Sequence, residues 1–462
     1  MLAVPKTLTF FGGNPFLFWE LALAPSRVYL PLLSIIAASL VSLVFGVTAL
    51  AQTPGVMLYD PVPMSTNDPY AIQPNGFFTP VQPLAPIRNG FRMVTNPVPY
   101  RGRMFLRGEY LGWVLDPMET PPLVTTSPTG TPQNQAAFVG GNDTRVLFGG
   151  DINDEFRSGV RVSGGWYVDP SRYWAIGGDY YQLFDEGESF SGSTSTNAIL
   201  GRPFFDIVAG RETAQLISFP ALVTGDISVD TETQFRSFGI HIQADALNAP
   251  GAVTQIANDC GREPRLDWLV GYRYVGLNDE IRINENLRSL TNVAQGTVNL
   301  NESFETENDF QGIELGVIRE VPMGRFWFET TSRIALGTNA QKVRINGSTQ
   351  LVEAGVPETF TGGLLAQRSN IGIYERDEFT VVPELGATLG FHVTPRFSLT
   401  VGYTLVYFSN VVRAGDQIDR DLNPGLIPIE SDPLTGPLRP QFIFRQTDFF
   451  AQGITAGADF RF

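Results

Sequence analysis

The chain has 462 residues, 43% of them hydrophobic, and a formal net charge of −15 at pH 7. The negative charge argues against a nucleic-acid-binding protein, and a mean hydropathy near zero excludes a helical membrane protein, which would be far more apolar. The single cysteine, Cys260, excludes an intrachain disulfide.

The first element is an apolar run at residues 28–50, which follows Arg27 and ends in the small-residue sequence Ala49-Leu50-Ala51. This pattern predicts a signal peptide over residues 1–51, cleaved between Ala51 and Gln52, and therefore an exported protein. The alternative is an uncleaved anchor, because the run is long enough to span a bilayer. Residues 52–103 are rich in Pro and Asn and have no period, which predicts a flexible periplasmic linker.

Strand patterns begin at Met104. The clearest is residues 379–393, where every odd position is apolar, followed by Thr394-Pro395 and a second alternating run. This predicts a hairpin, with a bulge at Pro383 because proline cannot donate to a ladder. Weaker copies give ten predicted strands in all: 104–115, 158–168, 173–184, 235–246, 265–277, 310–320, 325–337, 379–393, 396–411 and 447–462.

Long and short connections alternate between these strands. The links after the odd strands have 32 to 50 residues, whereas those after strands two, six and eight have four or fewer and the one after strand four has nineteen. Transmembrane barrels have this asymmetry, with short periplasmic turns and long extracellular loops. The sequence therefore predicts an all-β, transmembrane, antiparallel up-and-down β-barrel over residues 104–462. A further hairpin at 221–234 or 279–287 would raise the count from ten strands to twelve.

If the apolar face of each strand contacts lipid, the opposite face lines the lumen, and charges there can set ion selectivity. Ten or twelve strands leave at most a narrow pore, and a filled or gated lumen is favoured over an open one. The predicted lumen-lining residues are Arg107, Glu109, Arg161, Asp179, Asp245, Asp267, Arg273, Glu314, Glu329, Arg333 and Glu384.

Catalytic and metal-binding patterns are weak. The two histidines, His241 and His392, lie on the polar strand face without the three or four ligands of a zinc site, and no G-x-S-x-G motif occurs. Asp416, Asp419 and Asp421 could bind calcium or could simply lie in a solvated loop. The solvated loop is favoured because these residues lack the spacing of a known calcium loop. We therefore expect no enzyme activity, no cofactor and no metal.

Four stretches, in order along the chain, resemble one known family: "RGEYLGWVLDPMETPPLVTTSP", "GRPFFD", "GGLLAQRSNIGIYERDEFTVVPELGATLGF" and "VGYTLVYFSNVVRAGDQIDRDLNP". The family is the seventh of the bacterial β-barrel porins, best known from planctomycete-type bacteria, and the resemblance covers about residues 104–462. It implies an outer-membrane barrel and supplies no catalytic or ligand residues.

The final strand places alternate residues on one apolar face: Ile454, Ala456, Ala458, Phe460 and Phe462. A terminal aromatic after such a strand looks like the signal that the barrel-assembly machinery recognises. The strand should also pair with the first one and so close the barrel.

The expected function is an outer-membrane channel for passive diffusion of small hydrophilic solutes. The alternative is a structural or adhesion barrel that has a filled lumen and presents large extracellular loops. Expected partners are outer-membrane lipids, the assembly machinery, and small solutes or surface partners of unknown identity. Nucleic acid is not expected, and a homo-oligomer is left open.

Overall fold

The computed structural model describes residues 102–141, 143–247, 264–291, 296–428 and 436–462. The chain divides into two units, Met1–Met93 and Val94–Phe462, and all described residues belong to the second. The predicted signal peptide and most of the predicted linker lie outside the described residues and stay predictions. Among the described residues, no helix is long and apolar enough to span a bilayer.

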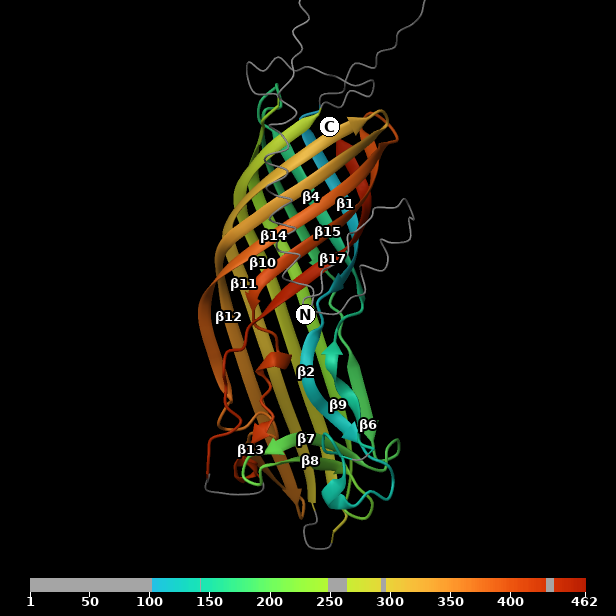
Figure 1. Cartoon of the computed structure of the whole chain (residues 1–462), viewed down its shortest axis with the longest axis vertical. Helices are drawn as coiled ribbons and strands as arrows, with labels where there is room; N and C mark the ends of the chain where they lie inside the picture. Colours follow the sequence, from blue (N-terminus) through green and yellow to red (C-terminus); the bar gives the residue numbers. More distant parts are fainter. Residues whose placement is uncertain (1–101, 142, 248–263, 292–295, 429–435) are drawn as a thin grey trace, which may run out of the picture. The chain divides into compact units, whose positions relative to one another are not determined.

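Ten antiparallel strands close into a barrel (Figure 1). The last strand pairs with the first, Phe105 opposite Arg461, so no open edge is left at the seam. The prediction of a ten-stranded antiparallel barrel is confirmed. The strands are β1 (Met104–Leu115), β4 (Phe156–Tyr167), β5 (Trp174–Leu183), β9 (Val223–Asp245), β10 (Arg265–Ser289), β11 (Gly296–Met323), β12 (Phe326–Glu353), β14 (Gly372–His392), β15 (Phe397–Val411) and β17 (Thr447–Arg461).

The twelve-strand alternative is wrong. Residues 221–234 and 279–287 fall almost entirely within β9 and β10, so they lengthen existing strands instead of adding a hairpin. Strands β11 and β12 reach 28 residues each. Much of what the sequence presented as long loops is therefore the continuation of barrel strands, visible in Figure 1 as ribbons that pass well beyond the barrel.

The polarity of the two strand faces inverts along each long strand. In the first part of β10, Trp268 and Val270 are more than half exposed while Arg273 is buried; further on, Ile281 and Ile283 are buried while Arg282 faces solvent. The first arrangement suits a wall bathed in lipid and the second a wall bathed in water. We call the first part the barrel half. The rest is the head, which consists of the described residues within 116–152, 185–233, 278–309, 340–378 and 412–446.

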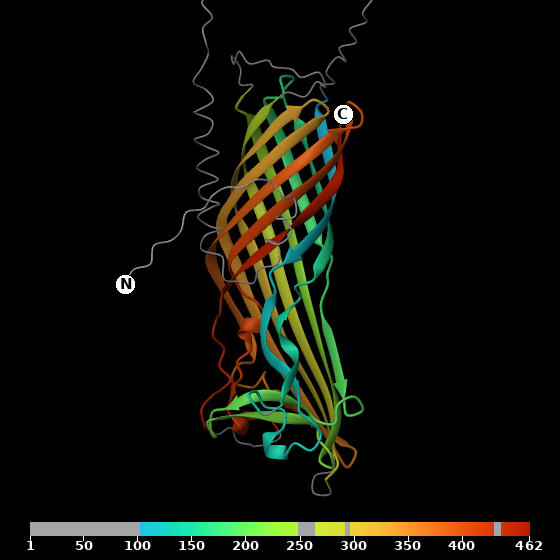
Figure 2. The same cartoon turned by 45° about the vertical axis from the view of Figure 1, so that its right-hand side comes forward.

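A second sheet helps to fill the head (Figure 2). It contains β16 (Asp421–Leu422), β7 (Leu200–Asp206), β2 (Met118–Thr126), β3 (Arg145–Ile152) and β8 (Arg211–Ser218). Its apolar residues, such as Met118 and Phe204, join Ile283, Phe304 and Ile345 of the long strands in one buried core. The head is completed by β6 (Ser189–Ser193), β13 (Val356–Thr361) and the 3₁₀ turns η3 (Gln133–Gln135), η4 (Gly415–Gln417) and η5 (Pro424–Leu426).

The predicted bulge at Pro383 is also wrong. Pro383 stands opposite Ile334 in an unbroken ladder with β12. The ladder between β14 and β15 begins only at the next residue, Glu384 opposite Val406. Proline has no backbone N–H to donate, and it is tolerated at this position because the ladder with β15 has not yet begun there.

The segment at residues 413–424, expected to be a solvated loop, is largely buried in the head. Arg413 is 2% exposed and pairs with Asp279 at 2.5 Å. Asp419 accepts hydrogen bonds from Arg439 and from the backbone N–H of Gln441. The expectation was wrong because these charges find buried partners, which removes the penalty of leaving water.

One carboxyl in this segment should make the head sensitive to pH. Burial raises the pKa of Asp416 from 3.8 to about 6, and Arg413 opposes the shift only in part. Because the folded state binds the extra proton, its stability should rise by up to about 2–3 kcal/mol as pH falls from 6 towards 4. Resistance of the head to proteolysis at pH 7.5 and pH 5 measures this. Burial also raises the pKa of Asp116 to about 6, so Asp416→Asn should be more resistant than the wild type at pH 7.5 and show a smaller pH response. An unchanged pH response in that variant would contradict the assignment.

Candidate functional site: the interior of the barrel half

Strand alternation directs a set of charged side chains into the barrel half, which we call the charged layer. Because successive residues of a strand face opposite sides, the lipid-facing apolar residues leave every second position to the interior. The arginines are Arg107, Arg161, Arg265, Arg273, Arg333 and Arg461; the carboxylates are Glu109, Asp179, Asp245, Asp267, Glu314, Glu320, Glu329, Glu384 and Asp459.

Arg273 of β10 is the centre of the layer. Its guanidinium binds both oxygens of Asp179 at 2.7 and 3.3 Å, donates to Ser237 Oγ at 3.1 Å and pairs with Glu314. Glu384 lies 3.7 Å from it. Arg333 adds a 2.7 Å bond to Asp179. Multiple charge-assisted bonds of this kind compensate the penalty for removing ions from water.

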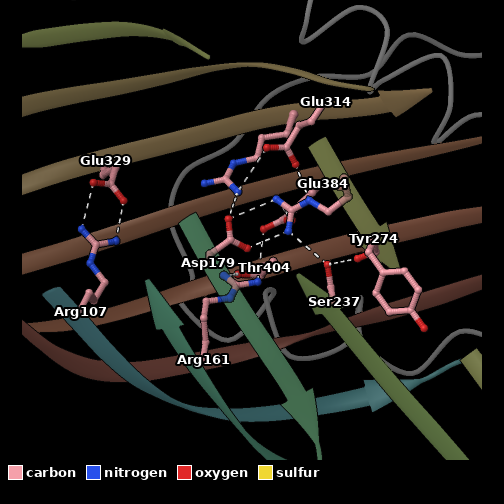
Figure 3. Close-up of polar contacts among 11 residues, drawn as sticks. Arg107, Arg161, Asp179, Ser237, Tyr274, Glu314, Glu329, Glu384 and Thr404 are labelled. Carbon is pink, nitrogen blue, oxygen red and sulfur yellow. Dashed lines mark hydrogen bonds and ion pairs between the residues drawn. The ribbon is translucent and has the colours of Figure 1, made fainter. Parts of the chain in front are cut away.

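Two further arginines extend the network (Figure 3). Arg107 forms a bidentate pair with Glu329 at 2.7 and 3.0 Å. Arg161 bonds to Glu384 at 3.2 Å and to Thr404 Oγ1 at 3.4 Å, and its guanidinium lies over the ring of Tyr181 at 4.8 Å. Such stacking combines charge with apolar contact.

A third group lies towards the end of the barrel that carries the short turns. Arg265 donates to Asp267 at 2.7 Å and lies 3.8 Å from Asp245. Arg461 of the last strand bonds to Glu320 at 3.2 Å, and Asp459 lies 3.6 Å from Arg107. The terminal strand thus contributes to the interior network as well as to barrel closure.

All eleven residues proposed from the sequence as lumen-lining belong to this layer. Ten of them take part in the ion pairs just described, whereas Glu109 makes no hydrogen bond or ion pair within the described part of the chain. Sequence reasoning missed Arg265, Glu320, Asp459 and Arg461. Arg265 and Glu320 lie an even number of residues from identified residues on their own strands. Asp459 stands opposite Arg107 on β1, and Arg461 lies two residues further along on the same face, so strand alternation could have found all four.

The remaining space in the layer is small. A cavity of about 110 Å³ is bordered by residues that include Arg107, Glu109, Arg161 and Glu384. Nine carboxylates face six guanidiniums, so the interior carries excess negative charge. Within the described ranges, no group of His, Cys, Asp and Glu side chains is arranged to hold a metal ion.

Between the charged layer and the head, apolar side chains fill the barrel; we call them the apolar layer. They come from nine of the ten barrel strands, and none is more than 4% exposed. Ring contacts run through the layer, for example Phe235 to Phe449 at 5.0 Å and Phe310 to Phe408 at 6.0 Å. Its members are Leu111, Trp113, Leu115, Tyr181, Leu183, Phe235, Val275, Leu277, Phe310, Ala335, Val382, Val406, Phe408, Val411, Phe449 and Ala451.

The apolar residues of the terminal strand face away from this interior. Ile454, Phe460 and Phe462 are each more than 40% exposed, whereas Thr455 and Asp459 between them are buried. Their proposed role as an assembly signal stays a prediction. Deleting Phe462 should lower the amount of barrel in the outer membrane several-fold, measured by membrane fractionation. Phe184→Ala, which removes an aromatic ring from the end of β5 with similar exposure, should leave it unchanged.

One family model, described as "Putative beta barrel porin-7 (BBP7)", matches residues 105–462. No curated protein matches the chain. Among solved structures, the outer membrane protease OmpT from Escherichia coli has 10% identity and a TM-score of 0.35, covering 79% of this chain and 98% of that one. The toluene transporter TodX from P. putida has 10% identity and a TM-score of 0.13, covering 78% and 90%. Both similarities are weak, and the fold is established by the strand pairing described above.

Proposed function

The chain belongs to the β-barrel porin-7 family. We propose that it is an outer-membrane barrel with a closed interior, whose head makes contacts at the cell surface. The head would face outwards, because short turns of transmembrane barrels face the periplasm. The closed interior and the surface role of the head correspond to the structural or adhesion barrel given as the alternative in the sequence analysis. Neither involves a catalytic step.

The observation that carries the proposal is the apolar layer. A diffusion channel needs a continuous path for water, and in open porins that path requires sixteen or more strands. Here Trp113, Phe310 and Phe408 lie in the interior and are 0% exposed, so no water reaches them. The buried core of the head follows directly after this layer. This favours a rigid support for the head over a passive pore.

The experiment is a planar bilayer recording of the refolded full chain, paired with protease treatment of intact cells. We expect no stepwise conductance at any voltage and cleavage in the head. Steady conductance of the unmodified protein would contradict a closed interior. A head protected from external protease while the barrel is in the membrane would contradict the outward orientation.

A second candidate is a gated channel that prefers cations. The specific observation in its favour is the charged layer, whose excess carboxylates border a cavity and would attract cations. It requires the apolar layer to move aside. Conductance that appears only after a voltage step or a change of conditions, and that favours cations, would support this candidate over the first.

A further inference from the structure

The outward wall of the head carries an unusual face, formed by two rows of residues that stand opposite one another on neighbouring strands. The first row is Ser191, Ser228, Asn284, Asn301, Ser348 and Thr361. The second is Ser193, Asp226, Asn286, Asn299, Gln350 and Thr359. We call these two rows the amide–hydroxyl face. All twelve side chains are at least partly exposed.

This face has almost no charge and no apolar side chain. Eleven of its twelve members are short amides or hydroxyls, and Asp226 is the exception. The rows nearer the barrel are different, since Glu305 stands opposite Arg344 and Glu307 opposite Lys342. The face spans six neighbouring strands about 4.8 Å apart, so it is about 24 Å wide. It therefore presents an array of regularly spaced hydrogen-bonding groups.

Much of this hydrogen-bonding capacity is unused. Each amide offers two donors and an acceptor, and each hydroxyl offers both functions. Asn286 donates to Asp226 at 2.8 Å, and longer bonds join Asn284 to Ser228 at 3.4 Å and Asn299 to Gln350 at 3.3 Å. Within the described residues the side chains of Asn301 and Ser348 make no hydrogen bond. Two hollows of about 420 and 230 Å³ lie on the face. Asn286 and Asn299 border the first, together with Asp226 and Arg288, and Asn301 and Ser348 border the second, together with Arg282 and Glu302 from outside the two rows.

We propose that the amide–hydroxyl face binds neutral saccharide chains that rise from the outer leaflet of the same membrane. This inference rests on the proposed outward orientation of the head. A phosphate-bearing or acidic ligand would call for arginine or lysine, and a protein partner for apolar or aromatic anchors, neither of which the two rows supply. Neutral sugar hydroxyls match amides and hydroxyls in both hydrogen bonding and charge.

The position of the face selects the source of the saccharide. Four of the six strands that carry it, β9 to β12, also form part of the barrel wall, whereas β6 and β13 belong to the head alone (Figure 1). Asn284 is ten residues beyond Tyr274, near the last apolar outward residues of β10, which corresponds to about 25–30 Å above the hydrocarbon for a tilted strand. Molecules beside the barrel at that height are the sugar chains of outer-leaflet glycolipids. Each contact is weak, and the regular array allows many at once.

The test uses the full chain in nanodiscs containing a lipid with a photoreactive neutral oligosaccharide. Light should attach this glycolipid at residues 284–286 or 299–301, located by fragmentation of the labelled peptides. Asn284→Glu combined with Asn301→Glu should reduce the attachment at least tenfold. The matched control, Glu305→Gln combined with Glu307→Gln, lies on the same wall nearer the membrane and should change it less than twofold.

Folding is checked by heat-dependent gel mobility, and the milder pair Asn284→Ala with Asn301→Ala serves if the charged variant does not fold. Equal attachment in variant and wild type would overturn the proposal, as would attachment confined to parts of the head outside the two rows. Stronger binding of a free or sulfated dextran than of the neutral glycolipid would also overturn it. None of these results would alter protease access to the head on intact cells, so failure here is distinguishable from failure of the proposed function.

Discussion

Replacing Arg273 with methionine should lower the free energy of unfolding of the barrel by about 3–5 kcal/mol, the range typical when one partner of a buried ion pair is removed. The side chain is 3% exposed and neutralises Asp179 and Glu314, with Glu384 close by. Methionine matches its length but leaves three carboxylates in the interior with too few cations. Urea unfolding of the refolded chain, followed by tryptophan fluorescence, measures the loss.

The control for this prediction is Arg282→Met on the same strand. Arg282 is 62% exposed at its side chain and pairs with Glu280 on the surface of the head. Exposed pairs contribute about 0–1 kcal/mol, so this variant should unfold almost like the wild type. Equal losses in the two variants would show that burial of the charged layer has no special energetic role.

Phe310→Ala combined with Phe408→Ala should convert the silent barrel into a conducting one. The two rings pack against each other in the apolar layer and are both fully buried. Their removal leaves a cavity next to the charged layer, where water can enter. Because carboxylates outnumber guanidiniums there, the new current should favour cations. Planar bilayer recordings with a salt gradient give both the conductance and the ion preference.

The same pair should also destabilise the barrel, because each buried Phe→Ala change typically costs about 3–5 kcal/mol. Ile313→Ala combined with Leu315→Ala is the matched control, since both side chains point outwards from β11. That variant should remain silent. A silent double phenylalanine variant that is folded and inserted would place the barrier to ions elsewhere.

Much of the barrel could be predicted from the sequence because period-two alternation depends only on one face meeting lipid. The predicted strand 104–115 is β1 residue for residue. The predicted versions of the long strands were too short, because the alternation continues into the head with inverted polarity. In the barrel half the inward residues are charged, such as Asp267 and Glu314. In the head the inward residues of the same strands are apolar, such as Ile281 and Phe304. The sequence analysis assigned the apolar face of every strand to lipid. Where the outward face became polar, it therefore predicted a loop instead of a continuing strand.

The site was predictable only in part for the same reason. The alternation of residues along each strand identified which charges point inwards, but not which of them pair. Arg161 and Glu384 are 223 residues apart in sequence, and they meet because barrel closure sets the register of their strands. The apolar layer was missed because Trp113 shares its parity with Arg107 and Glu109, and no local signal separates an inward from an outward aromatic residue. The burial of Arg413 and Asp419 depended on the second sheet, which long-range pairing creates.

One continuous strand, β10, passes from lipid to water while its two faces exchange polarity. Single cysteines along β10, in a Cys260→Ser background, test it: Trp268→Cys, Val270→Cys, Tyr272→Cys, Arg282→Cys, Asn284→Cys and Asn286→Cys, each carrying a spin label in a reconstituted bilayer. We expect labels at 268, 270 and 272 to be relaxed mainly by oxygen, and those at 282, 284 and 286 mainly by a water-soluble nickel complex. Equal access of the nickel complex to all six positions would contradict the account.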